Sequence, residues 1–110
     1  MSLISRRCKP CEDKNMKPYD QNEIEPLLRE ITHWSVTSDA KKIFREFIFT
    51  NFVGSMHFIN QVADIAETEG HHPDIHVFYN KVLIELWTHS VGGLTENDFI
   101  VAAKIDAIWK

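Results

Sequence analysis

The fold is decided by residues 51–89, which read NFVGSMHFINQVADIAETEGHHPDIHVFYNKVLIELWTH. Apolar residues recur at helical spacing as far as residue 69, and Gly70 is a natural helix end, so the first half predicts an amphipathic helix over 51–69. The alternation that follows predicts strands over 75–79 and 82–89, with a turn near Asn80-Lys81. The expected apolar stripe of the helix consists of Phe52, Met56, Ile59, Val62, Ala63 and Ala66.

Toward the N-terminus, a second pair of strands is predicted. Residues 33–37 and 42–50 are rich in β-branched and aromatic residues, and Ser38-Asp39 between them favours a turn. Before this hairpin, Asp20 can cap a short helix because apolar residues recur after it at helical spacing. These apolar residues are Ile24, Leu27, Leu28 and Ile31.

Toward the C-terminus, Gly92-Gly93 breaks the chain, and Thr95 to Asp98 resembles a capping box that opens a last helix. The order is therefore helix, two strands, helix, two strands, helix, which predicts an α+β fold with helices on one face of an antiparallel sheet. A chain of 110 residues supports one core. Residues 1–19 are polar and show no period, so we expect a flexible N-terminal extension before a single domain over 20–110.

The composition excludes several classes of function. The formal net charge is -4 and no run of Lys and Arg exceeds two residues, so the chain lacks a basic face for nucleic acid. No apolar stretch approaches the roughly 20 residues that cross a membrane, and the first residues lack the apolar block of a secretory signal. We therefore expect a cytoplasmic protein that binds neither nucleic acid nor membranes.

The two cysteines, Cys8 and Cys11, form the run Cys-Lys-Pro-Cys in the expected extension. This spacing is compatible with a redox pair or with half of a four-thiolate metal site. No second cysteine pair completes such a site, so incidental thiols in a frayed tail are the preferred interpretation.

Three of the six histidines, His71, His72 and His89, lie close in the chain to Glu67 and Asp98. They follow a helix end or close a strand, where sites form on rigid scaffolds. Imidazole titrates near neutral pH, so it can give a proton to a leaving oxygen or take one from nitrogen. The residues alone equally permit three histidines with ordinary structural hydrogen bonds. A metal site is disfavoured because adjacent histidines usually point apart and no H-E-x-x-H helix is present.

The run Glu67-Thr-Glu-Gly-His71-His72-Pro73, followed by Tyr79, His89 and Asp98, resembles the signature of the pterin-4a-carbinolamine dehydratase family. The similarity covers roughly residues 20–108, and so many matching points are far more specific than one short motif. The resemblance implies a four-stranded antiparallel sheet with about three helices packed on one face. It also implies dimers or tetramers that use no metal and no organic cofactor.

By this resemblance, His71 and His89 are the expected acid/base histidines, and His72 is expected to help hold the pterin. Glu67 and Asp98 are the expected carboxylates that orient these imidazoles or bind the substrate.

Three aromatic residues need separate interpretation. Trp34 and Tyr79 are interpreted as core aromatics rather than as rings that stack on the pterin. Trp87 departs from the family, which has small polar residues at this position, so the shape of the pocket is expected to differ locally.

The implied activity is that of a hydro-lyase. Its substrate is the 4a-hydroxytetrahydropterin left by an aromatic amino acid hydroxylase, which is thus the expected pathway partner, and its product is the quinonoid dihydropterin. Two alternatives stay open: a non-catalytic dimerisation or binding module, as in animal members that bind a transcription factor, and a relative that acts in another pterin pathway, such as that of molybdopterin. Retention of all three histidines argues against a purely binding role.

A homodimer or homotetramer is also expected from the sheet itself. Phe44 and Ile48 share one face of a strand, and Leu83 and Trp87 share a face of another. One layer of helices cannot cover both sides of a sheet, so this apolar surface needs a second subunit. The alternative is that the N-terminal extension folds over it.

Overall fold

The computed structural model describes residues 2–9 and 17–109. Among these, no helix is long and apolar enough to cross a membrane. The elements follow the predicted order, with one short 3-10 helix added before them. They are η1 (Leu3–Ser5), α1 (Gln21–Leu28), β1 (Ser35–Val36), β2 (Ile43–Ile48), α2 (Phe52–Glu69), β3 (Asp74–Phe78), β4 (Lys81–Leu86) and α3 (Glu96–Ile108).

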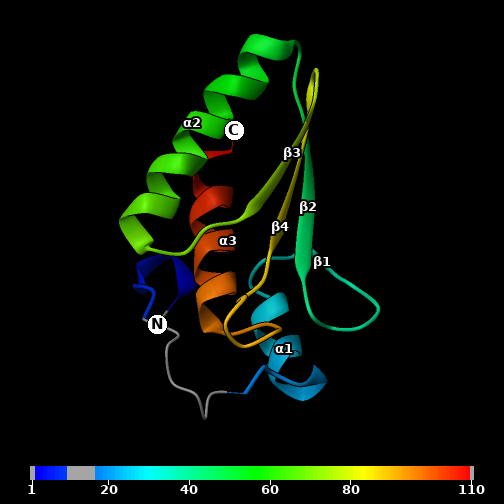
Figure 1. The fold of residues 1–110 in the computed structure, drawn as a ribbon, viewed down its shortest axis with the longest axis vertical. Coiled ribbons are helices and arrows are strands. Elements are labelled where there is room, and N and C mark those ends of the chain that lie inside the picture. Colours follow the sequence, from blue (N-terminus) through cyan, green and yellow to red (C-terminus); the bar gives the residue numbers. More distant parts are fainter. Residues whose placement is uncertain (1, 10–16, 110) are drawn as a thin grey trace.

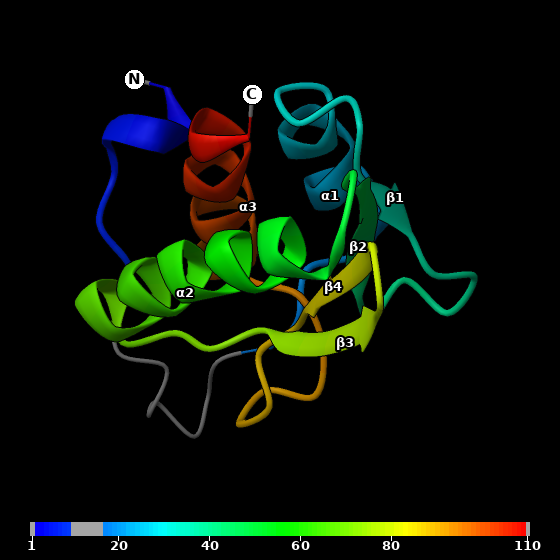
Figure 2. The same cartoon turned by 90° about the horizontal axis from the view of Figure 1, so that it is seen from above.

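The strands form one antiparallel sheet in the order β1-β2-β4-β3. Each predicted hairpin supplies two adjacent strands, and β2 pairs with β4 at the centre along its whole length. Figures 1 and 2 show α2 and α3 on one side of this sheet, with α1 near its β1 edge. The predicted α+β class, with a four-stranded antiparallel sheet and three helices on one face, is confirmed.

The helix α2 begins and ends where the sequence predicts. The Asn51 side chain accepts from the Gly54 N–H, and Gly70 closes the helix in the left-handed region at φ 66°. The buried face, however, is rotated from the predicted stripe: Phe52 and Met56 are 47% and 37% exposed. Val62 and Ala66 of the predicted stripe are buried, together with Ser55 and Phe58, which the prediction did not include.

One of the buried residues outside the predicted stripe is polar. The Ser55 hydroxyl donates to the Tyr79 carbonyl oxygen at 2.9 Å, so a small polar residue can occupy the helix–sheet contact with its hydrogen bond satisfied. An apolar stripe drawn from hydropathy alone omits such a residue.

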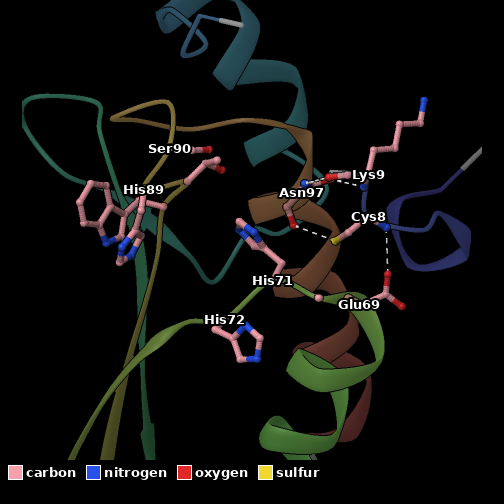
Figure 3. A pocket seen from close by; sticks show the side chains of 11 residues that line it. Cys8, Lys9, Glu69, His71, His72, His89, Ser90 and Asn97 are labelled. Carbon is pink, nitrogen blue, oxygen red and sulfur yellow. Dashed lines mark hydrogen bonds between the residues drawn. The ribbon is translucent and has the colours of Figure 1, made fainter. Parts of the chain in front are cut away.

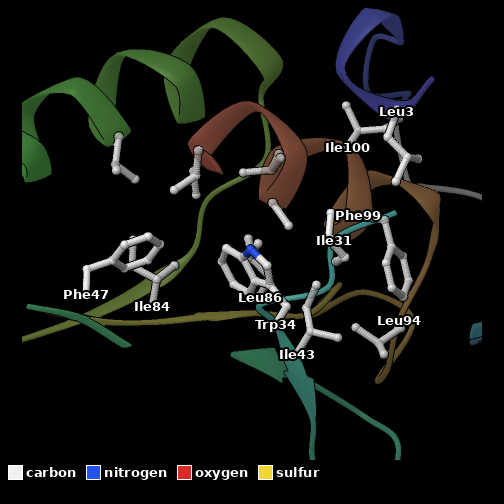
Figure 4. Packing of buried hydrophobic residues seen from close by; sticks show 14 of the residues in the cluster. Leu3, Ile31, Trp34, Ile43, Phe47, Ile84, Leu86, Leu94, Phe99 and Ile100 are labelled. Carbon is white, nitrogen blue, oxygen red and sulfur yellow. The ribbon is translucent and has the colours of Figure 1, made fainter. Parts of the chain in front are cut away.

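The core lies between the sheet and α3. Figure 4 shows Phe47, Ile84 and Leu86 of the sheet facing the helical layer, with Leu3 beside Ile100. Trp34 is 3% exposed and packs edge-on against Phe47, so its interpretation as a core aromatic is confirmed. The Trp34 indole N–H also donates to Asp106 of α3 at 2.8 Å, and Arg45 pairs with the same carboxylate at 2.7 Å.

Tyr79 was the second aromatic expected in the core, and this prediction is wrong. The turn between β3 and β4 falls at Tyr79-Asn80, one residue before its predicted place. Tyr79 has φ 52° and is 65% exposed, where its ring stacks on Phe52. A left-handed turn residue projects away from both sheet faces, so this ring reaches no core position.

Residues 2–9 pack against the domain, in contrast to the flexible extension expected over 1–19. Leu3 is 1% exposed within the core, and its N–H donates to Glu30 of the α1–β1 connection at 3.3 Å. Arg6 pairs with Glu96 at the start of α3 at 2.7 Å. One buried leucine and these long-range polar contacts hold a segment that has no period of its own. Residues 10–16, including Cys11, lie outside the described residues.

The chain before α1 is also held at its other end. The Tyr19 N–H donates to the Leu94 carbonyl oxygen at 2.8 Å. A Cβ atom on Gly93 would stand 2.6 Å from the Pro18 Cβ atom, so this close approach requires glycine.

Candidate active site

A pocket of about 580 Å³ opens where α2 ends, β4 leads into the next loop, and α3 begins. It lies on the helical side of one sheet end, and residues from the N-terminal segment complete its rim (Figure 3). All three predicted catalytic histidines line it. The lining residues are Cys8, Lys9, Glu69, Gly70, His71, His72, Trp87, Thr88, His89, Ser90 and Asn97.

His71 is placed by the turn that ends α2. The left-handed Gly70 reverses the chain, and the His71 N–H still donates to the Ala66 carbonyl oxygen at 3.2 Å. The imidazole Nε2 lies 2.6 Å from Asp98 Oδ1, with the two side chains 11% and 0% exposed. A buried carboxylate at this distance fixes both the ring orientation and the tautomer.

Asp98 is itself held from two further directions. Its Oδ2 accepts from the Thr88 hydroxyl at 2.8 Å and from the Thr95 N–H at 3.0 Å. The second contact belongs to the predicted capping box of α3. One carboxylate therefore caps a helix and orients a pocket histidine.

His72 points to a different environment. Its Nε2 lies 2.5 Å from Glu67 Oε2, but the two side chains are 60% and 77% exposed. Water competes for both partners, so the pair holds the imidazole only weakly.

His89 lies across the pocket from Asn97 in the view of Figure 3. Its ring stacks on Trp87 with centroids 4.0 Å apart and an interplanar angle of 28°. The Trp87 indole N–H donates to Asp74 of β3 at 3.0 Å, and the Lys42 ammonium lies 5.1 Å from the Trp87 ring centroid. The bulky Trp87 side chain thus supports a pocket histidine.

The three predicted histidines line the pocket, whereas the two predicted carboxylates do not. Glu67 and Asp98 each contact one histidine without lining the pocket themselves. Among the residues described, no group of three or more His, Cys, Asp or Glu side chains could hold a metal ion.

Most of the other lining residues, among them Cys8, Glu69 and Asn97, were not predicted as site residues. Glu69 stands inside the quoted run 67–73, but Asn97 carries no signal in the sequence. The polar sequence around Cys8 predicted a flexible extension. No motif or period within it indicates which part of the domain it packs against.

Two of these residues have strongly shifted pKa values. Burial, together with the nearby Glu69 carboxylate, raises the pKa of the Cys8 thiol from 9.0 to about 12. Desolvation would raise the pKa of Glu69, but hydrogen bonds from Lys104 and the Cys8 N–H, with the charges of Lys104 and Arg7, lower it from 4.5 to about 2. The thiol is neutral and the carboxylate ionised near neutral pH.

The comparison with protein families decides the identity. Residues 17–108 match the family model described as pterin 4 alpha carbinolamine dehydratase. The chain belongs to this dehydratase family. A dehydratase-family relative from Halorhodospira halophila (strain DSM 244 / SL1) is 43% identical over 108 residues, which cover 98% of each chain.

Solved structures of the dehydratase family have the same fold. A transcriptional coactivator/pterin dehydratase from Brucella melitensis superposes with a TM-score of 0.80 at 34% identity, covering 86% of this chain and 100% of the other. A pterin dehydratase-like protein described as a RuBisCO assembly factor in the alpha-carboxysome gives a TM-score of 0.59 at 27% identity. It covers 67% of this chain and 86% of its own. One protein of this fold is thus described as a coactivator and dehydratase, and the other as an assembly factor.

Proposed function

We propose that this chain is a 4a-hydroxytetrahydropterin dehydratase, a hydro-lyase that forms the quinonoid dihydropterin and water. The observation that carries the proposal is the convergence of His71, His72 and His89 on one pocket, in a chain of the dehydratase family. A dehydration of this kind needs a proton donor and a proton acceptor around a single ring system, and imidazole can serve as either.

In the proposed reaction, the bond between C4a and its hydroxyl oxygen breaks while N5 loses a proton. His71 or His89 protonates the departing oxygen, which leaves as water, and a second group takes the N5 proton. His72 helps to hold the pterin. The electron pair of the N5–H bond forms the new C4a=N5 double bond, so protons and electrons balance without an added cofactor.

The carboxylates have supporting roles in this proposal. Asp98 accepts a hydrogen bond from Nε2 of His71 whether the ring is neutral or protonated, which leaves the other ring nitrogen available to the substrate. Glu67 orients His72 in the same way but more weakly, because both side chains are exposed.

The direct experiment follows quinonoid dihydropterin formation from 4a-hydroxytetrahydropterin, with the spontaneous rate subtracted. His71→Ala and His89→Ala should each lower the rate by roughly 100-fold or more, which is the usual size of a lost acid/base contribution. His33→Ala, an exposed histidine in the turn before β1, is the matched control and should turn over like the wild type. Near-wild-type rates in both pocket variants, with unchanged circular dichroism, would remove them from the mechanism.

A binding function is the second candidate, and the neighbour described as a RuBisCO assembly factor favours it. The same assay distinguishes the two, since a binding module would show no turnover above the spontaneous rate in the wild type. A role in another pterin pathway would appear as turnover of a different pterin.

We also propose that the chain assembles into a homodimer or homotetramer. Among the described residues no helix covers the outer face of the sheet, where Ile48 and Phe78 are 54% and 58% exposed (Figure 2). Residues 2–9 pack against α3 and so leave this face uncovered. Light scattering at micromolar concentration should give at least a dimer, and a monomer would contradict the proposal. An aromatic amino acid hydroxylase as pathway partner and a cytoplasmic location stay predictions.

A further inference from the structure

One side of the pocket comes from a part of the chain that the family match does not include. Cys8 and Lys9 line the pocket, although the match begins at residue 17. Figure 3 shows them with Asn97 and Glu69 on the side of His71 away from His89, and the Lys9 side chain extends outward. The main chain and the Cys8 side chain, rather than the lysine ammonium, therefore form this wall.

Asn97 holds Lys9 with both ends of its side-chain amide. Its Oδ1 accepts from the Lys9 N–H at 3.0 Å, and its Nδ2 donates to the Lys9 carbonyl oxygen at 2.6 Å. The Asn97 carbonyl oxygen also accepts from the Cys8 thiol at 3.6 Å. Because Asn97 is only 6% exposed, these bonds are protected from competition by water.

Glu69 holds the preceding residues from the end of α2. Its carboxylate accepts from the Cys8 N–H at 2.9 Å and pairs with Arg7 at 3.1 Å. Lys104 of α3 pairs with the same carboxylate at 2.7 Å, and the Glu69 side chain is 4% exposed. Two buried polar side chains, one from each helix, thus bind the main chain of Cys8 and Lys9, and Glu69 also holds the Arg7 side chain.

We infer that residues 7–9 form a clamped strap that completes the substrate-binding wall of the pterin pocket, with Glu69 and Asn97 as positioning residues. The inference rests on the proposed function. Buried polar groups are costly unless they are hydrogen-bonded, so two of them aimed at a terminal main chain indicate that its position matters. The catalytic geometry does not need the strap, because His71 is held by Asp98 and His89 by Trp87.

Loosening the strap should therefore weaken substrate binding and spare the proton-transfer step. We expect Asn97→Ala and Glu69→Ala to raise KM by about 10-fold while kcat stays within about 2-fold, the pattern of lost uniform binding. Arg29→Ala removes an exposed ion pair with Glu25 on α1 and is the matched control, with both constants unchanged. An unchanged KM in both folded variants, or a loss confined to kcat, would overturn the inference.

A second measurement needs neither turnover nor these variants. In the full-length chain with Cys11→Ser, iodoacetamide labels Cys8 at alkaline pH, and 7,8-dihydrobiopterin serves as the pocket probe. If the strap forms the wall, saturating probe should slow the labelling at least about 5-fold, because Cys8 lines the pocket. An equal rate with and without the probe contradicts it.

The two proposals fail in different ways. Protection of Cys8 without turnover retains the strap as part of a pterin-binding site and overturns the dehydratase. Turnover without protection, together with an unchanged KM in both variants, retains the dehydratase and overturns the strap.

Discussion

His71 and His72 are neighbours in the chain, yet their carboxylate partners lie in opposite environments. His71 is 11% exposed and meets the fully buried Asp98, whereas His72 is 60% exposed and meets Glu67, which is 77% exposed. The two contacts have almost the same length, 2.6 Å and 2.5 Å.

The contrast shows that length does not measure what such a contact contributes. An exposed pair is screened and contributes about 0 to 1 kcal/mol, while removing one partner of a buried pair costs about 3 to 5 kcal/mol. Asp98 therefore fixes the His71 ring, whereas Glu67 leaves the His72 ring able to reorient.

The largest effect is expected at the buried member of the comparison. Asp98→Asn keeps the shape but disturbs the bonds with His71, Thr88 and Thr95, so the rate should fall by about 100-fold and the unfolding free energy by about 3 kcal/mol or more. Stopped-flow assays and urea unfolding measure the two losses. If Asp98→Asn were as stable and active as the wild type, the buried His71–Asp98 pair would contribute no more than the exposed His72–Glu67 pair.

Glu69 is a second carboxylate with a buried side chain, and it should affect how stability depends on pH. Because the pKa of Glu69 falls from 4.5 to about 2 on folding, its contribution is complete above pH 4.5 and is lost as the pH falls toward 2. The shift corresponds to at most about 3 kcal/mol. Glu69→Gln should therefore destabilise the chain at neutral pH, with the difference from wild type shrinking between pH 4.5 and 2 in urea titrations. A difference that is constant with pH contradicts this origin.

Variants of Trp87, whose ring stacks on His89, should lower the rate by an intermediate amount. Stacking contributes about 0.5 to 1.5 kcal/mol, so Trp87→Ser should slow turnover by up to about 10-fold through a less ordered His89. Trp87→Phe keeps a ring against His89 while losing the bond to Asp74, and should lose less. Steady-state kinetics of both variants test this order, and equal losses would assign the effect to the bond with Asp74, which both variants lack.

The smallest effect is expected at the exposed pair. Glu67→Gln retains a side chain of the same size and removes a charge that water already screens, so kcat/KM should change by less than about 3-fold. Raising the salt concentration should not enlarge this change. A loss comparable to that of Asp98→Asn would show that the exposed pair becomes buried when the substrate binds.

The sequence predicts the features that local patterns specify. The caps Asn51 and Gly70 and the capping box at Thr95 define helix ends within a few residues of chain, and alternation defines the strands. Asp98, which the family resemblance named as an orienting carboxylate, does lie beside His71. The resemblance could name it because the family signature includes the spacing between the two residues. The rotation of the buried face of α2 was missed, in part because Ser55 is buried while its hydroxyl donates to the Tyr79 carbonyl oxygen in the turn after β3.

Contacts between distant segments were beyond this kind of prediction. Lys9 and Asn97 are 88 residues apart, and neither shows a period or a motif that indicates the other. Their contact depends on the N-terminal segment packing against α3, a tertiary arrangement that propensity does not encode. Tyr79 failed for a related reason, because a turn shifted by one residue turns its ring outward.

The span of these contacts has a consequence for synthesis on the ribosome. A nascent chain that has emerged to residue 90 already contains His71, His72 and His89, but not the carboxylate that orients the first of them. The N-terminal residues must then wait for the last helix, because Arg6 meets Glu96 across 90 positions and Lys9 meets Asn97 across 88. Because these contacts close a very long loop and can form only late in synthesis, the N-terminal segment is not expected to become ordered early. The pocket should therefore form only once α3 has emerged, and a fragment stalled before Asp98 would carry the histidines without a site.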